Sequence, residues 1–102
     1  MSLETEFEKD LWHTVDVARE YQYTPTFFMQ MLKDHGGVDT AKRLLAKSEP
    51  QTGLFELYNL KLLHESMEAV VLQDKYHSLF TEIELSEAHR RLEELRYFEK
   101  GQ

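Results

Sequence analysis

Hydrophobic positions in the first part of the chain recur at the spacing of an α-helix. Between residues 5 and 22 four apolar side chains fall at i, i+4, i+8 and i+11, namely Phe7, Leu11, Val15 and Ala18. This spacing places all four on one face of a helix. Acidic residues crowd the first turns, where they favour the positive end of the helix dipole. We therefore predict an amphipathic helix over about 5–22, with Trp12 beside its apolar face.

A proline and a glycine pair bracket the next predicted helix. Thr24 followed by Pro25 is typical of a helix start, with the threonine as N-cap and the proline in the first turn. Gly36 is suited to the left-handed residue that ends a helix. After Gly37 the apolar positions return at helical spacing, at Val38, Ala41, Leu44 and Leu45. The pattern predicts two helices joined at a glycine corner.

The middle of the chain holds a loop and short helical segments. Residues 48–53 combine proline, glycine and polar residues, which is typical of a loop. The helix predicted after Gly53 is apolar on most sides, which indicates a central, largely buried position. Ser66 is expected to cap a further helix, and Asp74 to cap a single helical turn.

The last helix has the clearest local signals. Thr81 and Glu84 form a capping box, and apolar residues follow at Leu85, Ala88, Leu92 and Leu95. Glu87 lies four residues before Arg91, a spacing that allows an ion pair on the helix surface. We predict a helix over about 81–98. The whole pattern indicates an all-α protein, a compact orthogonal bundle of five or six short helices forming one domain over 1–102.

Composition narrows the classes to which the protein can belong. The chain of 102 residues is 41% hydrophobic and 12% aromatic, which fits a globular domain. It has no cysteine, so disulfides, thiolate zinc sites and thiol catalysis are excluded. No apolar run approaches the ~20 residues that a membrane span needs. We expect a cytoplasmic protein without a membrane segment.

The net charge of −7 is unevenly distributed along the chain. Residues 1–23 and 65–102 each carry a net charge of −4, whereas residues 24–64 carry +1. An acidic protein is poorly suited to neutralising phosphates, which requires clustered lysine and arginine. The distribution still leaves room for a modest basic face on the central segment.

Several stretches together resemble an uncharacterised bacterial family. They are YTPTFFMQMLKDHGGVDTAKRLL, GLFELYNLKLL, ESMEAVVL and LFTEIELSEAHRRL. The shared features are a Tyr-x-Pro-Thr-x-Phe opening, a His-Gly-Gly-Val corner and an Ala-Lys-Arg-Leu-Leu helix, and the resemblance covers about residues 21–95. Residues 62–65 depart from the Arg-Leu-Asp-Leu pattern associated with that position. The resemblance implies a discrete helical module, and it implies no activity.

Histidine is the residue type in this chain that is best suited to catalysis or metal binding. Asp10 with His13, and Asp74 with His77, are i, i+3 pairs that could together supply four ligands to a divalent metal. Simpler roles, a helix cap and an exposed acidic turn, are favoured for them. His64 and Glu65 lack the second histidine that a zinc-protease helix requires. We therefore predict no catalytic residue, cofactor or metal site, and keep a small metal-dependent hydrolase as the last alternative.

Other polar residues have structural explanations. For Glu84, Glu87 and His89 a solvated helix face is the favoured interpretation. His35 lies at a helix end beside two glycines, where it could line a small pocket, although the helix dipole alone favours a positive charge there. Lys42, Arg43 and Lys47 follow a glycine corner in the manner of a helix-turn-helix. With His35 they are the candidate nucleic-acid or partner contacts, but Asp39 in the first turn would repel phosphates. Nucleic-acid binding is therefore an alternative that is not favoured.

The aromatic residues support the first-choice hypothesis. A small bundle cannot be expected to bury every ring, and rings left exposed together mark an interface. The candidate interface residues are Trp12, Tyr21, Tyr97 and Phe98. The sequence thus favours a non-enzymatic interaction or accessory module that binds a protein partner or forms a homodimer.

Overall fold

The computed structural model describes residues 2–47 and 52–99, and within these ranges the protein is entirely helical. The α-helices are α1 (Leu3–Glu20), α2 (Thr26–His35), α3 (Gly37–Leu45), α4 (Thr52–Asn59), α5 (Met67–Val71) and α6 (Glu82–Glu94). Two 3-10 helices complete the structure, η1 (Leu63–Glu65) and η2 (Asp74–Leu79). The predicted all-α bundle is therefore confirmed. None of the described helices is both long and apolar enough to cross a membrane.

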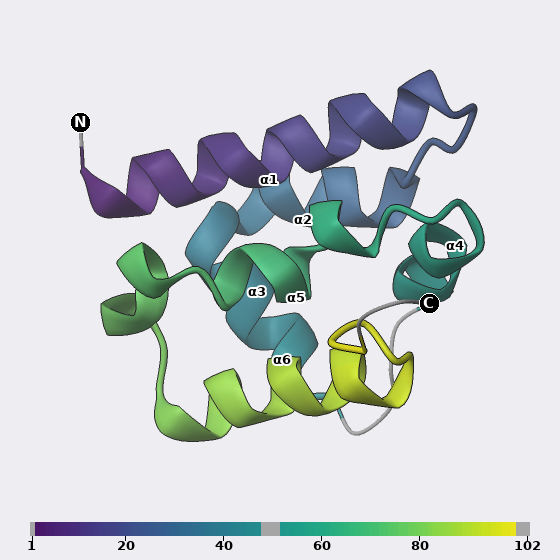
Figure 1. The fold of residues 1–102 in the computed structure, drawn as a ribbon. Helices are drawn as coiled ribbons and strands as arrows, with labels where there is room; N and C mark the ends of the chain where they lie inside the picture. The colour runs from purple at the N-terminus through teal and green to yellow at the C-terminus, as the bar shows by residue number, and fades with distance from the viewer. Residues whose placement is uncertain (1, 48–51, 100–102) are drawn as a thin grey trace.

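The helices are arranged around α3 and α5. In Figure 1 these two lie between α1 along one side of the molecule and α6 along the other, with α2 beside α1 and α4 at one edge. The predicted apolar face of α1 is buried in full. Phe7, Leu11 and Val15 join the main core, whereas Ala18 belongs to a separate small cluster. The main core also holds residues of α2, α3, α5, η2 and α6, among them Leu32, Leu44, Val71, Tyr76 and Ala88.

The glycine corner fixes how closely α3 approaches α1. Gly36 has φ of 80°, a conformation that residues with a side chain rarely adopt. A Cβ atom on Gly37 would lie 2.7 Å from the Cα of Glu8, so α1 leaves no room for one. The Oε1 of Glu8 also accepts a hydrogen bond of 3.0 Å from the Gly37 N–H. A carboxylate of α1 thus satisfies a free backbone donor at the start of α3.

Two of the four predicted helix N-caps are present in the structure. The caps at Ser66 and at Thr81, the latter with its capping box, are confirmed. The cap at Thr24 is wrong: α2 begins at Thr26, after an inverse γ-turn in which the Thr24 carbonyl accepts from the Thr26 N–H. The cap at Asp74 is also wrong, because η2 begins at Asp74 itself, which places that residue inside the first turn.

Three helices end in the same hydrogen-bonded motif, which sets their boundaries. After α1, α4 and α6 a residue adopts positive φ, namely Gln22 (65°), Lys61 (62°) and Arg96 (61°). In each case the next N–H reaches back to a carbonyl in the last turn, the Schellman arrangement. The last helix therefore ends at Glu94 rather than at the predicted residue 98.

The position of α4 also differs from the prediction. Leu54 and Leu57 are buried, but Phe55 and Tyr58 on the same helix are exposed. Figure 1 shows α4 at the edge of the bundle, away from its centre. Its two exposed rings explain why its sequence is apolar on most sides without the helix being central. Residues 48–51 of the predicted loop lie outside the described residues.

Candidate functional site

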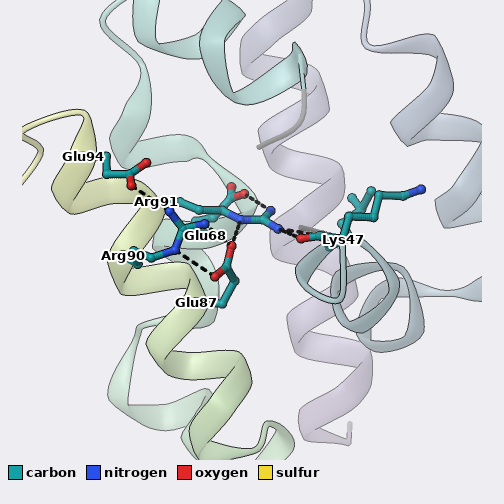
Figure 2. A network of polar contacts seen from close by, with 7 residues as sticks. Lys47, Glu68, Glu87, Arg90, Arg91 and Glu94 are labelled. Atoms are coloured by element: carbon teal, nitrogen blue, oxygen red, sulfur yellow. Dashed lines mark hydrogen bonds and ion pairs between the residues drawn. The ribbon is translucent and has the colours of Figure 1, made fainter. Parts of the chain in front are cut away.

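A row of alternating charges runs from the surface of α6 into the interior. Arg90 contacts Glu94 and Glu87, and Arg91 contacts Glu87 and Glu68, with the four ion pairs between 2.6 and 3.2 Å (Figure 2). The side chain of Arg91 is 0% exposed and that of Glu68 is 4% exposed. These five residues, Glu68, Glu87, Arg90, Arg91 and Glu94, form the ion-pair network.

The buried arginine also completes the end of another helix. Its Nη2 donates to the carbonyl oxygens of Leu44 and Lys47, each at 2.9 Å. Carbonyls in the last turn of a helix have no partner within the helix and favour a nearby cation. Arg91 therefore ties α6 to the C-terminal end of α3 while it pairs with Glu68 of α5.

The two inner carboxylates have opposite electrostatic environments. Hydrogen bonds from Arg90, and then from Arg91, hold the pKa of Glu87 below its usual value against the opposing effect of partial burial. Burial raises the pKa of Glu68, and its contact with Arg91 only partly offsets this. The network holds three carboxylates and two guanidinium groups. Glu68 is its innermost member, whereas Glu94, at the other end, is exposed to solvent.

Glu68 also lines an apolar hollow that lies between helices. This hollow, the Phe27 pocket, has a volume of about 420 Å³ and is bounded by α1, α2 and α4, with α3 and α5 behind them. Its lining includes Thr14, Ala18, Phe27, Leu54, Leu57 and Glu68. Phe27 is 66% exposed, which places its ring at the mouth. The volume falls in the range of about 300–1,000 Å³ that is typical of ligand pockets.

The ends of α1 and α4 both contribute to the wall of the Phe27 pocket, through Ala18 and Tyr23 of the first and Leu57 of the second. Tyr23 and Leu62 each follow a left-handed residue, and their N–H groups donate to the carbonyls of Ala18 and Leu57. An apolar contact often accompanies this Schellman arrangement. Here Ala18, Leu57 and Leu62 form one small apolar cluster with Tyr23 against it, separate from the main core. Burial, and then the nearby Glu56 carboxylate, raises the pKa of the Tyr23 hydroxyl at this wall.

The predicted basic contacts do not form an unpaired basic surface. The Nζ of Lys42 lies 2.8 Å from Glu84, and the Nε of Arg43 lies 2.9 Å from Asp39. Lys47 is exposed and contributes its carbonyl to Arg91. Two of the three cations thus have an acidic partner in the molecule. Nucleic-acid contact by this trio stays a prediction.

His35 lies where the sequence suggested, beside the glycine corner. It borders a shallow hollow of about 400 Å³ with Gly36, Gly37 and Glu8, and its Nδ1 is 3.7 Å from Asp39. The hollow is separate from the Phe27 pocket, whose described lining includes none of these four residues.

The predicted aromatic interface is divided among separate places. Trp12 is half-buried against the main core, and Tyr21 is exposed at the end of α1. Tyr97 and Phe98 follow α6, where the Phe98 ring stacks on His89 with a centroid distance of 4.5 Å. None of the four is among the described residues that line the Phe27 pocket, although all four remain at least partly exposed.

The acidic face expected on α6 is only partly solvated. Glu84 and Glu87 are each 20% exposed, because Lys42 covers the first and Arg91 engages the second. The solvated-face interpretation is therefore wrong at these two positions, whereas His89 is exposed. Among the described residues no group of three or more histidines and carboxylates is placed to hold a metal ion, so the paired Asp and His residues are not brought together.

The Phe27 pocket and the buried end of the ion-pair network were missed by sequence reasoning. Glu68 and Arg91 are 23 residues apart, and the pocket draws on five helices. No local signal distinguished Phe27 from Phe28, because adjacent residues on a helix can both be buried, as Leu44 and Leu45 are. Comparison of the chain with family models, with curated proteins and with solved structures found no match. The resemblance to a bacterial helical family therefore stays a prediction.

Proposed function

We propose that this protein is a non-enzymatic interaction module of the cytoplasm, which binds a segment of a protein partner in the Phe27 pocket. The observation that carries the proposal is the exposed Phe27 ring at the mouth of an apolar hollow. Aromatic residues beside such hollows are typical anchors of protein interfaces. The described lining holds no histidine or lysine, and its one acidic residue is engaged by Arg91, which favours binding over catalysis.

Charge indicates what kind of partner fits. The chain has a net charge of −7, and Glu68 is the one acidic or basic residue among the described residues that line the pocket. Complementary charge speeds association and excludes wrong partners. We therefore commit to a basic, amphipathic protein segment as the occupant. A second copy of this acidic chain would bring like charges together.

The test uses a library of random peptides displayed on phage, selected against the wild-type protein. Phe27→Ala should weaken binding of the selected peptides by at least about tenfold, as expected for an interface anchor. Ile83→Ala is the control, because Ile83 is another large apolar side chain on a helix and is 82% exposed. It should leave affinity within about twofold.

Two outcomes would overturn the proposal. One is the absence of any peptide that binds saturably. The other is equal loss of affinity in the Phe27 and Ile83 variants, which would indicate general stickiness of exposed apolar groups. Sedimentation of the unliganded protein adds a further check. If the protein forms a dimer that Phe27→Ala dissociates, the pocket binds a second copy of this chain and not a different partner.

A further inference from the structure

The lining of the Phe27 pocket has two chemical parts. Its walls are mainly apolar, from Ala18, Leu54 and Leu57 among others, and Glu68 is the acidic residue among the described residues that line it. The Glu68 carboxylate accepts a hydrogen bond of 3.2 Å from Arg91. A carboxylate offers about four acceptor sites, so a second cation can also be bound.

Glu68 shares its cationic partner with a second carboxylate. Arg91 lies 3.2 Å from Glu68 and 2.6 Å from Glu87, so the shorter contact goes to Glu87. Arg90, the other cation of the network, is likewise shared between Glu87 and Glu94. A cation that entered the pocket would give Glu68 a second partner of opposite charge.

We infer that the partner segment is anchored by a lysine side chain, with its aliphatic stem along the apolar walls and its ammonium group at Glu68. Lysine joins a four-carbon stem to a compact charge, which matches a site with apolar walls and one carboxylate. A neutral apolar anchor would make no ion pair with Glu68, and an acidic anchor would place a second negative charge beside it. This inference rests on the proposed function, because it names the anchor of the same partner.

The direct test compares three probes of equal length: hexylammonium chloride, hexan-1-ol and sodium hexanoate. Each is titrated into the isotopically labelled protein, and binding is followed by NMR shifts of the Ala18, Leu54 and Leu57 methyl groups. Hexylammonium should bind at least about tenfold more tightly than hexanol, since hydrogen bonds between charged groups are the strong ones. Hexanoate should bind most weakly. Equal binding of the ammonium and the alcohol would overturn the inference.

A pair of variants separates a site from general attraction to an acidic protein. Glu68→Gln should abolish the preference for the ammonium probe. Glu93→Gln removes the same charge from an exposed position on α6 and should keep the preference. A preference that survives Glu68→Gln would contradict the inference. If Glu68→Gln does not fold, the order of affinities of the three probes for the wild-type protein, measured at the pocket methyl groups, still tests the inference.

Failure of this inference can be told from failure of the proposed function. In a selected peptide that depends on Phe27, replacing lysine with norleucine removes the charge and keeps the stem. If no such replacement weakens binding by at least about tenfold, the lysine anchor is wrong while the interaction module stands. If the binding of no selected peptide depends on Phe27, the proposed function is wrong. The three-probe titration then tests only whether the pocket prefers an ammonium group.

Discussion

Two buried threonines differ in what their hydroxyl groups contact. Thr14 Oγ1 donates to the Glu65 carbonyl at 2.5 Å, which ties α1 to η1 beside the Phe27 pocket. Thr40 is 0% exposed, and its hydroxyl has no hydrogen-bond partner among the described residues. A buried hydroxyl without a hydrogen-bond partner lowers the free energy of unfolding, whereas a hydrogen-bonded one raises it.

Substituting valine at the two positions should therefore have opposite effects. Thr40→Val removes the unsatisfied hydroxyl and should raise the free energy of unfolding by about 1 kcal/mol. Thr14→Val leaves a backbone carbonyl without its donor and should lower it by roughly 1–2 kcal/mol. Urea unfolding of both variants measures the difference. Equal destabilisation would show that the Thr40 hydroxyl does have a partner.

Glu87 is expected to make stability sensitive to acid. Its pKa is lowered in the folded protein, so its contribution is present above the unfolded value of 4.5 and is lost as the pH falls through the folded value. Glu87→Gln should cost roughly 1–3 kcal/mol at pH 7, where the charged hydrogen bonds are intact. Below the folded pKa of Glu87, the variant and the wild type should have the same free energy of unfolding. Urea unfolding as a function of pH provides the measurement.

The contribution of Glu68 to stability should change with pH in the opposite direction. Its folded pKa is raised, so the protein takes up this proton at a higher pH than the unfolded chain does. Stability therefore gains from Glu68 as the pH falls through the folded pKa, and Glu68→Gln should remove that gain. Parallel pH profiles for the Gln variants of Glu68 and Glu87 would contradict the assignment of charges in the ion-pair network.

At the scale of whole elements, three helix ends place a residue other than glycine in the left-handed region. This conformation costs a residue with a side chain about 1–2 kcal/mol. Gln22 is exposed, and its side chain is not needed to form the motif, which uses backbone hydrogen bonds. The end of α1, which forms part of the pocket wall, thus carries avoidable strain.

Gln22→Gly should raise the free energy of unfolding by about 1 kcal/mol. Glu20→Gly is the control, because Glu20 is the last residue of α1 and has helical conformation. There glycine should be destabilising by about 0.5–1 kcal/mol. The midpoints of urea unfolding report both changes. Destabilisation by Gln22→Gly would show that the side chain supports the helix end.

Elements with local signals could be predicted from the sequence. The Thr81 capping box, the Ser66 cap and the Gly36 corner act within a few residues of themselves, and each is found in the structure. The end of α6 could not be predicted, because Arg96 gives no sign of left-handed backbone. Its conformation follows from the bonds that close the Schellman motif.

The candidate site depends on contacts far apart in the sequence. The spacing of Glu87 and Arg91 predicted their ion pair, but both were assigned to the helix surface. Their burial depends on Glu68 and on the end of α3, which only the packed bundle brings close. Exposed aromatic rings were expected, but Phe27 was not among the candidate interface residues. Its neighbour Phe28 packs against the main core.

At the scale of the whole molecule, the acidic charge governs which large partners can bind. Lys42 and Arg43 are paired with acids, so we expect no retention of DNA or RNA in a gel-shift assay at low salt, where electrostatic binding is strongest. Retention that weakens with added salt and is reduced by Lys47→Ala would contradict this and support the nucleic-acid alternative.

A partner bound in the Phe27 pocket should lie close to Thr24, which lines that pocket. Because the chain has no cysteine, a spin label can be attached at one introduced cysteine, either Thr24→Cys at the mouth of the Phe27 pocket or Ile83→Cys on α6. NMR line broadening of a selected peptide then reports which label lies near it. We expect the label at residue 24 to broaden the NMR lines of the peptide strongly, and the label at residue 83 to broaden them much less. Equal broadening from both labels, or stronger broadening from residue 83, would contradict binding in the Phe27 pocket.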